Sequence, residues 1–281
     1  PPTHTFFSED PRPAMKRYLD FYLTTIKVAI MEQFQYRVAN YFYMIGMVAE
    51  PVIYLVVWST VANAQGGQVG GYTAGGFAAY YIVWTLVRNM NIVFTPYGWE
   101  WRIQRGRLSA ELLRPIHPLH NDVAFFAGWK FVVIILWLPL AAFLAWVFKP
   151  TLSPTLVEVG VFFLAIWGAY LIRTMFLSLL GMITFWTTRV SAIYELFFAL
   201  ELVLSGRLVP MSLMPEWVQR VSDFLPFKWT FQFPIESLIA HLSPQELFGG
   251  LGLQALWILA GLLAVNIMWK FGIQRFSAVG N

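Results

Sequence analysis

Residues 122–148, DVAFFAGWKFVVIILWLPLAAFLAWVF, form an apolar run that is longer than the roughly 20 residues needed to cross about 30 Å of hydrocarbon as a helix. The whole chain has a matching composition. Its 281 residues are 58% hydrophobic and 12% charged, and the mean hydropathy is +0.60. A soluble domain of this length needs no run of this kind. The sequence therefore predicts a polytopic membrane protein.

Five further apolar runs accompany this one, at 41–62, 74–98, 156–182, 190–209 and 248–269. Together the six runs predict an all-α polytopic membrane protein with six transmembrane helices. No internal repeat or domain boundary divides them, so residues 1–281 are expected to form a single membrane domain. The opening PPTHTFFSEDPRP is polar and rich in proline, and it predicts no cleavable signal peptide.

Residues 14–38 carry too many charges to span a membrane, and they predict an amphipathic helix at the membrane surface. On a helical wheel Lys16, Asp20, Thr24 and Lys27 share one side, and Leu19, Tyr22, Leu23, Ile26 and Ile30 lie opposite.

The basic side chains predict the orientation in the cell membrane, because cytoplasmic loops are enriched in lysine and arginine. The net charge of +4 is scattered over loops instead of gathered on one face, which argues against nucleic acid as a partner. The predicted cytoplasmic side carries both termini and receives Arg12, Lys16, Arg17, Lys27, Arg37, Arg102, Arg105, Arg107, Arg114, Arg189, Lys270 and Arg275, whereas the other side receives Lys149, Arg207, Arg220 and Lys228.

A polar stretch, RGRLSAELLRPIHPLH at 105–120, interrupts the apolar runs on the predicted cytoplasmic side. Leu108, Leu112 and Leu113 recur at helical spacing, and Pro115 ends the pattern. Arg107 and Glu111 lie four residues apart, as in a helical ion pair. The stretch predicts a short amphipathic helix that docks on another protein, and a solvated connector is the alternative.

Residues 210–247 predict a structure at the external surface, because five prolines divide them into pieces too short to span. Apolar residues recur at helical spacing in two pieces, Pro215–Leu225 and Pro234–His241. We expect two short helices with Phe227 to Phe233 at the turn between them, forming an external re-entrant helical hairpin. A plain external loop is the alternative.

The order of these parts resembles the membrane subunit of an ABC-2-type exporter. The motifs GRLSAELLRPIHPLH (106–120) and SGRLVPMSLMPEWVQRVSDFLPFKWTFQFPIESL (205–238) are similar to a branch of permeases usually encoded as two paralogues beside one ATPase. The resemblance implies that the coupling region, 99–121, inserts into a cleft on the nucleotide-binding subunit. It assigns this role to Arg105, Gly106, Arg107, Leu108, Glu111, Leu112 and Arg114.

The resemblance also implies the partners. They are a dimer of ABC ATPase subunits that carries ATP and Mg, and a second permease, more plausibly a paralogue than an identical copy. The chain has no G-x-x-x-x-G-K-[ST] motif, so we expect it to bind no cofactor and to hydrolyse no ATP itself. The alternative class is an integral membrane enzyme, such as a lipid-modifying transferase. That class needs a surface cluster of His, Asp or Glu, which the sequence does not suggest.

Ionisable residues inside apolar runs are the next candidates, since each costs at least about 2.5–3.5 kcal/mol to insert. They are Glu50, Arg88, Arg173, Glu195 and Glu201. Glu195 and Arg173 are expected near the cytoplasmic interface. Glu50, Arg88 and Glu201 each fall roughly 15 Å deep at about 1.5 Å per residue. We expect Glu50 and Arg88 to pair, and a polar contribution to the substrate path is the alternative.

Aromatic residues are plentiful in the runs, and most are expected to be ordinary packing residues. In the resembled fold the second and fifth spans line the path between two permeases, which points to Tyr81, Trp84 and Phe198 for substrate contact. His117 and His120 lack a third ligand, so no metal site is expected. No serine nucleophile motif is present, and no catalytic residue is predicted.

Overall fold

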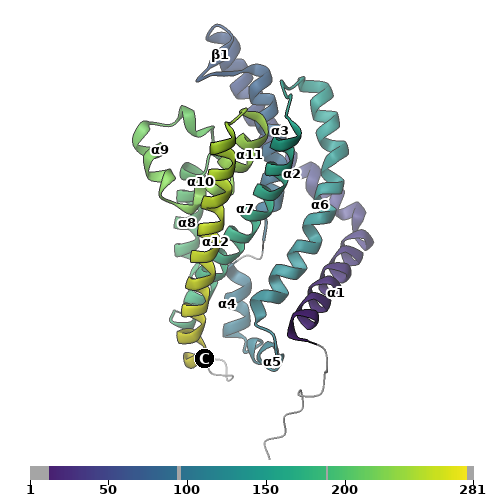
Figure 1. Cartoon of the computed structure of the whole chain (residues 1–281), viewed down its shortest axis with the longest axis vertical. Coiled ribbons are helices and arrows are strands. Elements are labelled where there is room, and N and C mark those ends of the chain that lie inside the picture. Colours follow the sequence, from purple (N-terminus) through teal and green to yellow (C-terminus); the bar gives the residue numbers. More distant parts are fainter. Residues whose placement is uncertain (1–12, 94–95, 188, 277–281) are drawn as a thin grey trace, which may run out of the picture.

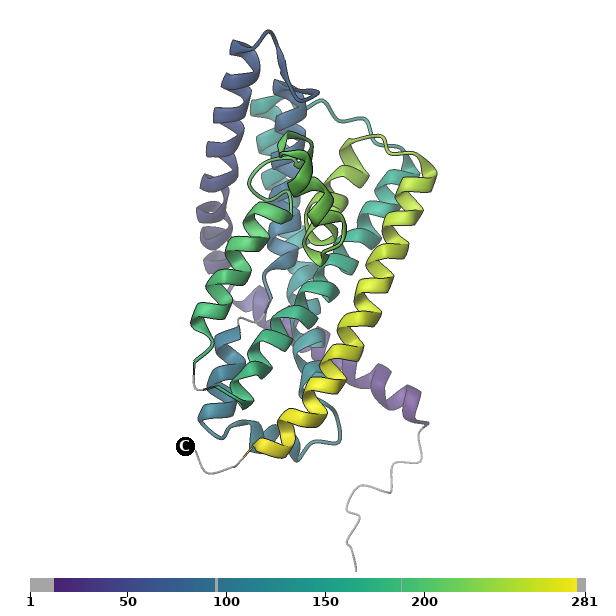
Figure 2. The same cartoon turned by 90° about the vertical axis from the view of Figure 1, so that its left-hand side faces the viewer.

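The computed structural model describes residues 13–93, 96–187 and 189–276, and its long helices run along the long axis of the molecule (Figures 1 and 2). Four helices in these residues are long and apolar enough to cross a membrane. They are α2 (Arg37–Ala64), α6 (Pro118–Phe148), α7 (Leu156–Met182, followed by a 3₁₀ turn to Phe185) and α12 (Pro244–Gly272, followed by a 3₁₀ turn to Arg275).

The runs at 74–98 and 190–209 form shorter helices than predicted. Helix α3 (Ala74–Asn91) has 18 residues and α8 (Ser191–Leu204) has 14, so they are about 27 Å and 21 Å long. Ile92 is extended after α3, and Gly206 has a left-handed φ of +80° beyond α8. In the described residues four helices are therefore both long and apolar enough to span, where the sequence predicted six spans. The prediction for residues 94 and 95 lies outside the described residues.

Lys130 explains how α3 can end inside the protein. This side chain of α6 is fully buried, and its Nζ donates to the carbonyl oxygen of Asn89 at 2.9 Å and to that of Ile92. The last carbonyls of a helix have no partner within the helix, and a cation beside them is favourable. The cation also lies 4.5 Å from the ring of Trp129. This role of Lys130 was not predicted, although an ionisable residue inside the apolar run at 122–148 is a signal for a polar partner.

Helix α1 (Ala14–Gln35) packs obliquely along α6 (Figure 2). Gly128 of α6 permits the close approach, because a Cβ there would lie 2.6 Å from the carbonyl oxygen of Ile26. The predicted helix at 14–38 is wrong at its end, since Tyr36 separates α1 from α2. Leu19 and Leu23 of the predicted apolar face are exposed, and the position of this helix at the membrane surface stays a prediction. Arg12 and both chain ends lie outside the described residues.

The two ends of the molecule are built differently (Figure 1). At one end a small antiparallel hairpin, β1 (Gln68–Val69) and β2 (Tyr72–Thr73), turns through Gly70 and Gly71, which both have positive φ. The other end carries α4 (Pro96–Gln104) and α5 (Leu108–Leu112), the region expected to be cytoplasmic.

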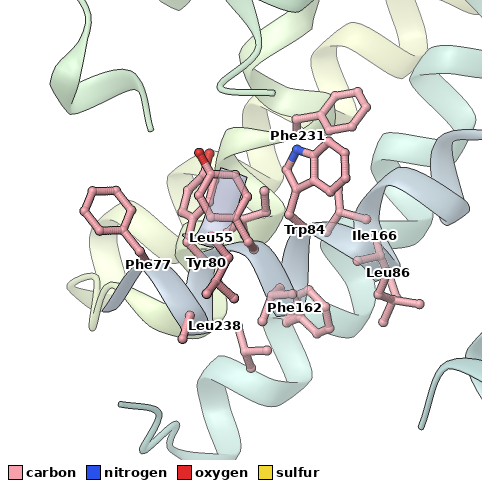
Figure 3. Close-up of a cluster of buried hydrophobic side chains, with 14 of the residues drawn as sticks. Leu55, Phe77, Tyr80, Trp84, Leu86, Phe162, Ile166, Phe231 and Leu238 are labelled. Atoms are coloured by element: carbon pink, nitrogen blue, oxygen red, sulfur yellow. The ribbon is translucent and has the colours of Figure 1, made fainter. Parts of the chain in front are cut away.

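Helix α3 is the centre of the main core (Figure 3). Phe77, Tyr80 and Trp84 of α3 are fully buried, and they pack with residues of α2 and α7 such as Leu55 and Ile166. A helix that is buried on nearly every side needs apolar residues all around, which is the pattern of this run.

The segment at 210–247 is helical, but its predicted two-helix layout is wrong. It contains a 3₁₀ turn at 211–213 and three helices, α9 (Glu216–Asp223), α10 (Pro226–Thr230) and α11 (Gln232–Ile239). Helix α10 occupies the predicted turn, and Pro226 begins it at a position where proline is favoured. Gln254 of α12 donates to the carbonyl oxygen of Trp229 at 2.8 Å, which fixes this short helix against the bundle. Trp217 of α9 is exposed.

Substitution of Lys130 tests whether this side chain caps the C-terminus of α3. We expect Lys130→Met to lower the free energy of unfolding by about 1–3 kcal/mol, because buried carbonyl groups lose their donor. Thermal unfolding of the purified protein in detergent measures this effect. Lys270→Met makes the same chemical change at an exposed site of α12 and is expected to leave stability within about 0.5 kcal/mol. Equal stability of the two variants would contradict the capping role.

Candidate functional site

Helices α4 and α5 are anchored to the bundle by two fully buried side chains, Trp99 and Leu108. Trp99 lies against Gly181 of α7, where a Cβ would come within 2.4 Å of the Trp99 Cβ. Its ring centroid is 6.3 Å from that of Trp269 on α12. Leu108 was predicted to face a partner protein, but it is buried in the same cluster. Its role is to hold α5 in place.

Arg102 ties α4 to both neighbouring elements. Its Nη1 and Nη2 donate to the carboxylate of the buried Asp122 on α6 at 2.9 and 2.6 Å, and its Nε lies 3.3 Å from Glu111 Oε1 on α5. Bidentate pairs of this type fix both distance and orientation. Burial raises the pKa of Glu111, and Arg102 opposes that shift. The predicted Arg107–Glu111 pair is replaced by Arg102–Glu111, and Glu111 is not available as a free docking group.

The outward side of this region is both basic and apolar. Gly106 makes the turn between α4 and α5 with φ of +66°, and the Arg107 guanidinium lies 4.4 Å from the ring of Trp101. Leu113 is 81% exposed, although it was not among the residues assigned to coupling. We call the exposed set Arg105, Arg107, Leu112, Leu113 and Arg114 the coupling face.

The two histidines that follow the coupling face, His117 and His120, make hydrogen bonds within the protein. His117 Nδ1 accepts the amide N–H of Leu119 at 3.1 Å, and burial together with His120 lowers the pKa of His117 to about 4. His117 is therefore neutral at neutral pH. The Tyr22 hydroxyl lies 2.7 Å from His120 Nδ1, which joins α1 to this region. Among the described residues, no group of three His, Asp or Glu side chains is placed to hold a metal ion.

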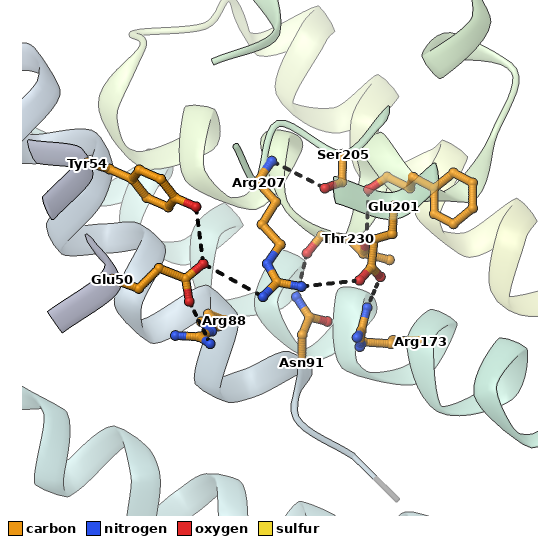
Figure 4. A network of polar contacts seen from close by, with 10 residues as sticks. Glu50, Tyr54, Arg88, Asn91, Arg173, Glu201, Ser205, Arg207 and Thr230 are labelled. Carbon is orange, nitrogen blue, oxygen red and sulfur yellow. Dashed lines mark hydrogen bonds and ion pairs between the residues drawn. The ribbon is translucent and has the colours of Figure 1, made fainter. Parts of the chain in front are cut away.

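A second candidate site is a chain of alternating charges between the helices (Figure 4). Arg88 Nη2 lies 2.8 Å from Glu50 Oε2, the pairing that we expected from the sequence. Arg207 lies 3.9 Å from both Glu50 and Glu201, and Glu201 also pairs with Arg173. Each carboxylate thus lies between two guanidinium groups. We call these five residues, contributed by α2, α3, α7, α8 and the loop after α8, the charge chain.

Two arginines make contacts that the sequence did not suggest. Arg173 was expected near the cytoplasmic interface, and Arg207 was counted with the external loops. Both join helices inside the protein, and Arg173 is nearly fully buried. Such groups need close partners, because a lone charge in this environment is costly.

The loop that presents Arg207 is held by hydrogen bonds to α3 and α11. The Tyr80 hydroxyl lies 2.6 Å from the carbonyl oxygen of Gly206 and 2.8 Å from Gln232 Oε1, and the Tyr81 hydroxyl donates to the carbonyl oxygen of Leu208 at 3.2 Å. A Cβ at Gly206 would lie 2.1 Å from Gln232 Oε1. Glycine is therefore required here both for its positive φ and for the close approach.

The three aromatic residues expected to contact substrate differ from one another in exposure. Tyr81 and Trp84 are fully buried, so neither offers surface in this conformation. Phe198 is partly exposed, and its ring centroid is 5.7 Å from the Arg173 guanidinium. A cavity of about 400 Å³ lies instead beside Glu50, Arg88 and Tyr54, between α2 and α3. Substrate contact by the three aromatic residues stays a prediction.

A double-mutant cycle tests the first link of the charge chain. We expect Glu50→Gln and Arg88→Gln to destabilise the protein by about 1–3 kcal/mol each, because each leaves a charge without its partner. The double variant should lose less than the sum, with a coupling energy of about 0.5–3 kcal/mol in thermal unfolding. The matched cycle is Glu216→Gln with Arg220→Gln, an exposed pair at 3.0 Å, for which we expect near additivity. Strict additivity at Glu50 and Arg88 would contradict the pairing.

The comparisons agree with a membrane protein that contains long apolar helices. The family model of the ABC-2 family transporter proteins matches residues 48–280, which is most of the chain. A comparison with curated proteins found no match. Membership of this family implies a membrane transport subunit that associates with an ATPase subunit and is not itself an enzyme. The chain therefore belongs to the ABC-2 transporter family, as the motifs at 106–120 and 205–238 predicted.

Proposed function

We propose that the chain is one half of the membrane domain of an ATP-driven exporter. A separate ABC ATPase dimer binds ATP and Mg and docks on the coupling face, and a second permease completes the translocation path. The observation that carries the proposal is the structure of α4 and α5. The coupling face is exposed, basic and apolar, and the buried side chains of Trp99 and Leu108 anchor it to the bundle.

The anchoring supports a role in transmitting movement. Trp99 holds α4 to α7 and α12, and Arg102 holds it to Asp122 of α6 and Glu111 of α5. A push on α5 is then passed to three long helices, since the packed core between them does not deform continuously. A loosely tethered connector would absorb the same push.

The lateral surface supports a second permease as partner. Large apolar side chains of α2 and α8 are exposed, including Ile53, Val57, Leu196 and Leu200. The cavity beside Glu50 and Arg88 adds polar groups to the same region. In the proposed exporter this region faces the translocation path, both termini are cytoplasmic, and the segment at 210–247 covers the external exit.

Substitutions on the coupling face test the docking role. We expect Leu113→Asp and Arg107→Glu to weaken ATPase binding by about 2 kcal/mol or roughly thirtyfold, the size of a typical hot-spot loss. The measurements are retention of the ATPase subunit during purification and ATP hydrolysis by the complex in liposomes. The permease itself should still insert and fold, because Leu113 contributes exposed surface and not core.

The matched control is Leu156→Asp. Leu156 is 91% exposed at the start of α7, where an acidic residue suits the helix N-terminus. This variant should retain the ATPase and its activity. Wild-type ATPase retention and transport by both coupling-face variants would overturn the proposed docking surface, and an equal loss in Leu156→Asp would show that the effect is not local.

A further inference from the structure

A cleft of about 670 Å³ opens at the end of the molecule opposite α5. The β1–β2 hairpin, the start of α3, the chain at 151–153 and the end of α11 enclose it. It is separate from the coupling face and from the cavity beside Glu50. Its lining includes Tyr72, Thr151, Ser212, Glu236, Ile239 and His241.

Glu236 gives this cleft its charge. None of the described residues that line the cleft is a lysine or an arginine. The imidazole of His241 lies 3.1 Å from the carboxylate of Glu158, which compensates any positive charge on the ring. The Glu236 carboxylate receives a hydrogen bond from the Gln232 amide, although a carboxylate can accept about four.

The dipoles of the neighbouring helices do not reverse the negative charge that Glu236 gives the cleft. The positive N-terminus of α3 and the negative C-terminus of α11 both lie on the cleft, and each carries about half a charge at most, so they offset each other. Thr73 Oγ1 already accepts the N–H of Gly76 at 3.1 Å. The carboxyl group of Glu236 is therefore the group that decides which ligands are favoured.

Tyr72 supplies an aromatic surface on the same cleft. Its ring packs against Phe77, with the centroids 5.3 Å apart, and is therefore held in a fixed orientation. Ammonium groups bind both to carboxylates and to aromatic faces. Hydroxyl groups of Thr151 and Ser212 add hydrogen-bond partners for the rest of a small polar ligand.

We propose that this cleft is a binding site for a small organic cation, whose ammonium group is held by Glu236 and whose apolar part lies against Tyr72 and Ile239. The site is independent of the proposed coupling to an ATPase. Burial raises the pKa of Glu236, and a bound cation would stabilise its ionised form.

The ligand would also be connected to the charge chain. Gln232, which donates to Glu236, accepts the backbone N–H of Met211 at 3.3 Å and lies 2.8 Å from the Tyr80 hydroxyl. Tyr80 in turn contacts the carbonyl oxygen of Gly206, next to Arg207. Occupancy of the cleft is thus coupled by hydrogen bonds to the loop that places Arg207 between Glu50 and Glu201.

Calorimetric titration of the purified full-length chain in detergent tests the site, with tyramine as the probe. The matched probes are 4-ethylphenol, which lacks the amine, and 4-hydroxyphenylacetate, which carries the opposite charge. We expect saturable binding of tyramine and affinities at least about tenfold weaker for the other two, because they lose the ion pair.

Two variants locate the binding. Glu236→Gln should weaken tyramine binding about tenfold or more, and Ser212→Trp should block the mouth of the cleft from an exposed position. Glu216→Gln, an exposed carboxylate on α9, should bind like the wild type. Near-ultraviolet circular dichroism of each variant checks that its tertiary structure is intact.

The assignment is overturned by any of three results. They are the absence of saturable tyramine binding by the wild-type protein, equal binding by folded Glu236→Gln, and equal affinity for 4-ethylphenol, which would show apolar partition only. None of these results depends on ATP hydrolysis, so they leave the coupling proposal to its own test.

Discussion

The charge chain from Arg88 through Glu50, Arg207 and Glu201 to Arg173 is the constraint on which the rest of this structure depends. An unpaired charge among apolar helices costs several kcal/mol, whereas alternating charges offset one another's desolvation. The charge chain joins four helices and one loop that are distant in sequence. Their relative positions are therefore fixed by directional contacts, in addition to the non-directional burial of apolar side chains.

The requirement that buried polar groups have partners also explains the irregular backbone inside the protein. Where α3 stops, Lys130 satisfies its terminal carbonyls, and Asn91 donates to the carbonyl oxygen of Thr230 at 2.7 Å. Where α8 stops, Tyr80 and Tyr81 satisfy the loop at 205–209. Broken helices are tolerated within a membrane protein only where protein groups take over the freed backbone groups. Each break here has such a donor, supplied by a different helix.

The two ends of the molecule differ in shape and charge, which fits different roles. The end that carries α5 has a buried anchor and an exposed basic surface, the combination needed to receive a partner and transmit its movement. The opposite end has a cleft with an acidic group and hydrogen bonds that lead inward. Tyr80 and Gln232 connect that cleft by hydrogen bonds to the loop that presents Arg207.

The sequence by itself determined the class of protein, the position of the long helices and the family. Apolar runs and loop charges are local signals, and the motifs at 106–120 and 205–238 are contiguous in the chain. The Glu50–Arg88 pair was also predictable, because both residues fall at similar depth in adjacent runs. Tertiary structure alone decided that Glu111 pairs with Arg102, that Leu108 is an anchor, and that α3 and α8 end early. Those outcomes depend on which side chains of distant helices, such as Asp122, Lys130 and Tyr80, arrive at the same place, and no periodicity along one segment carries that information.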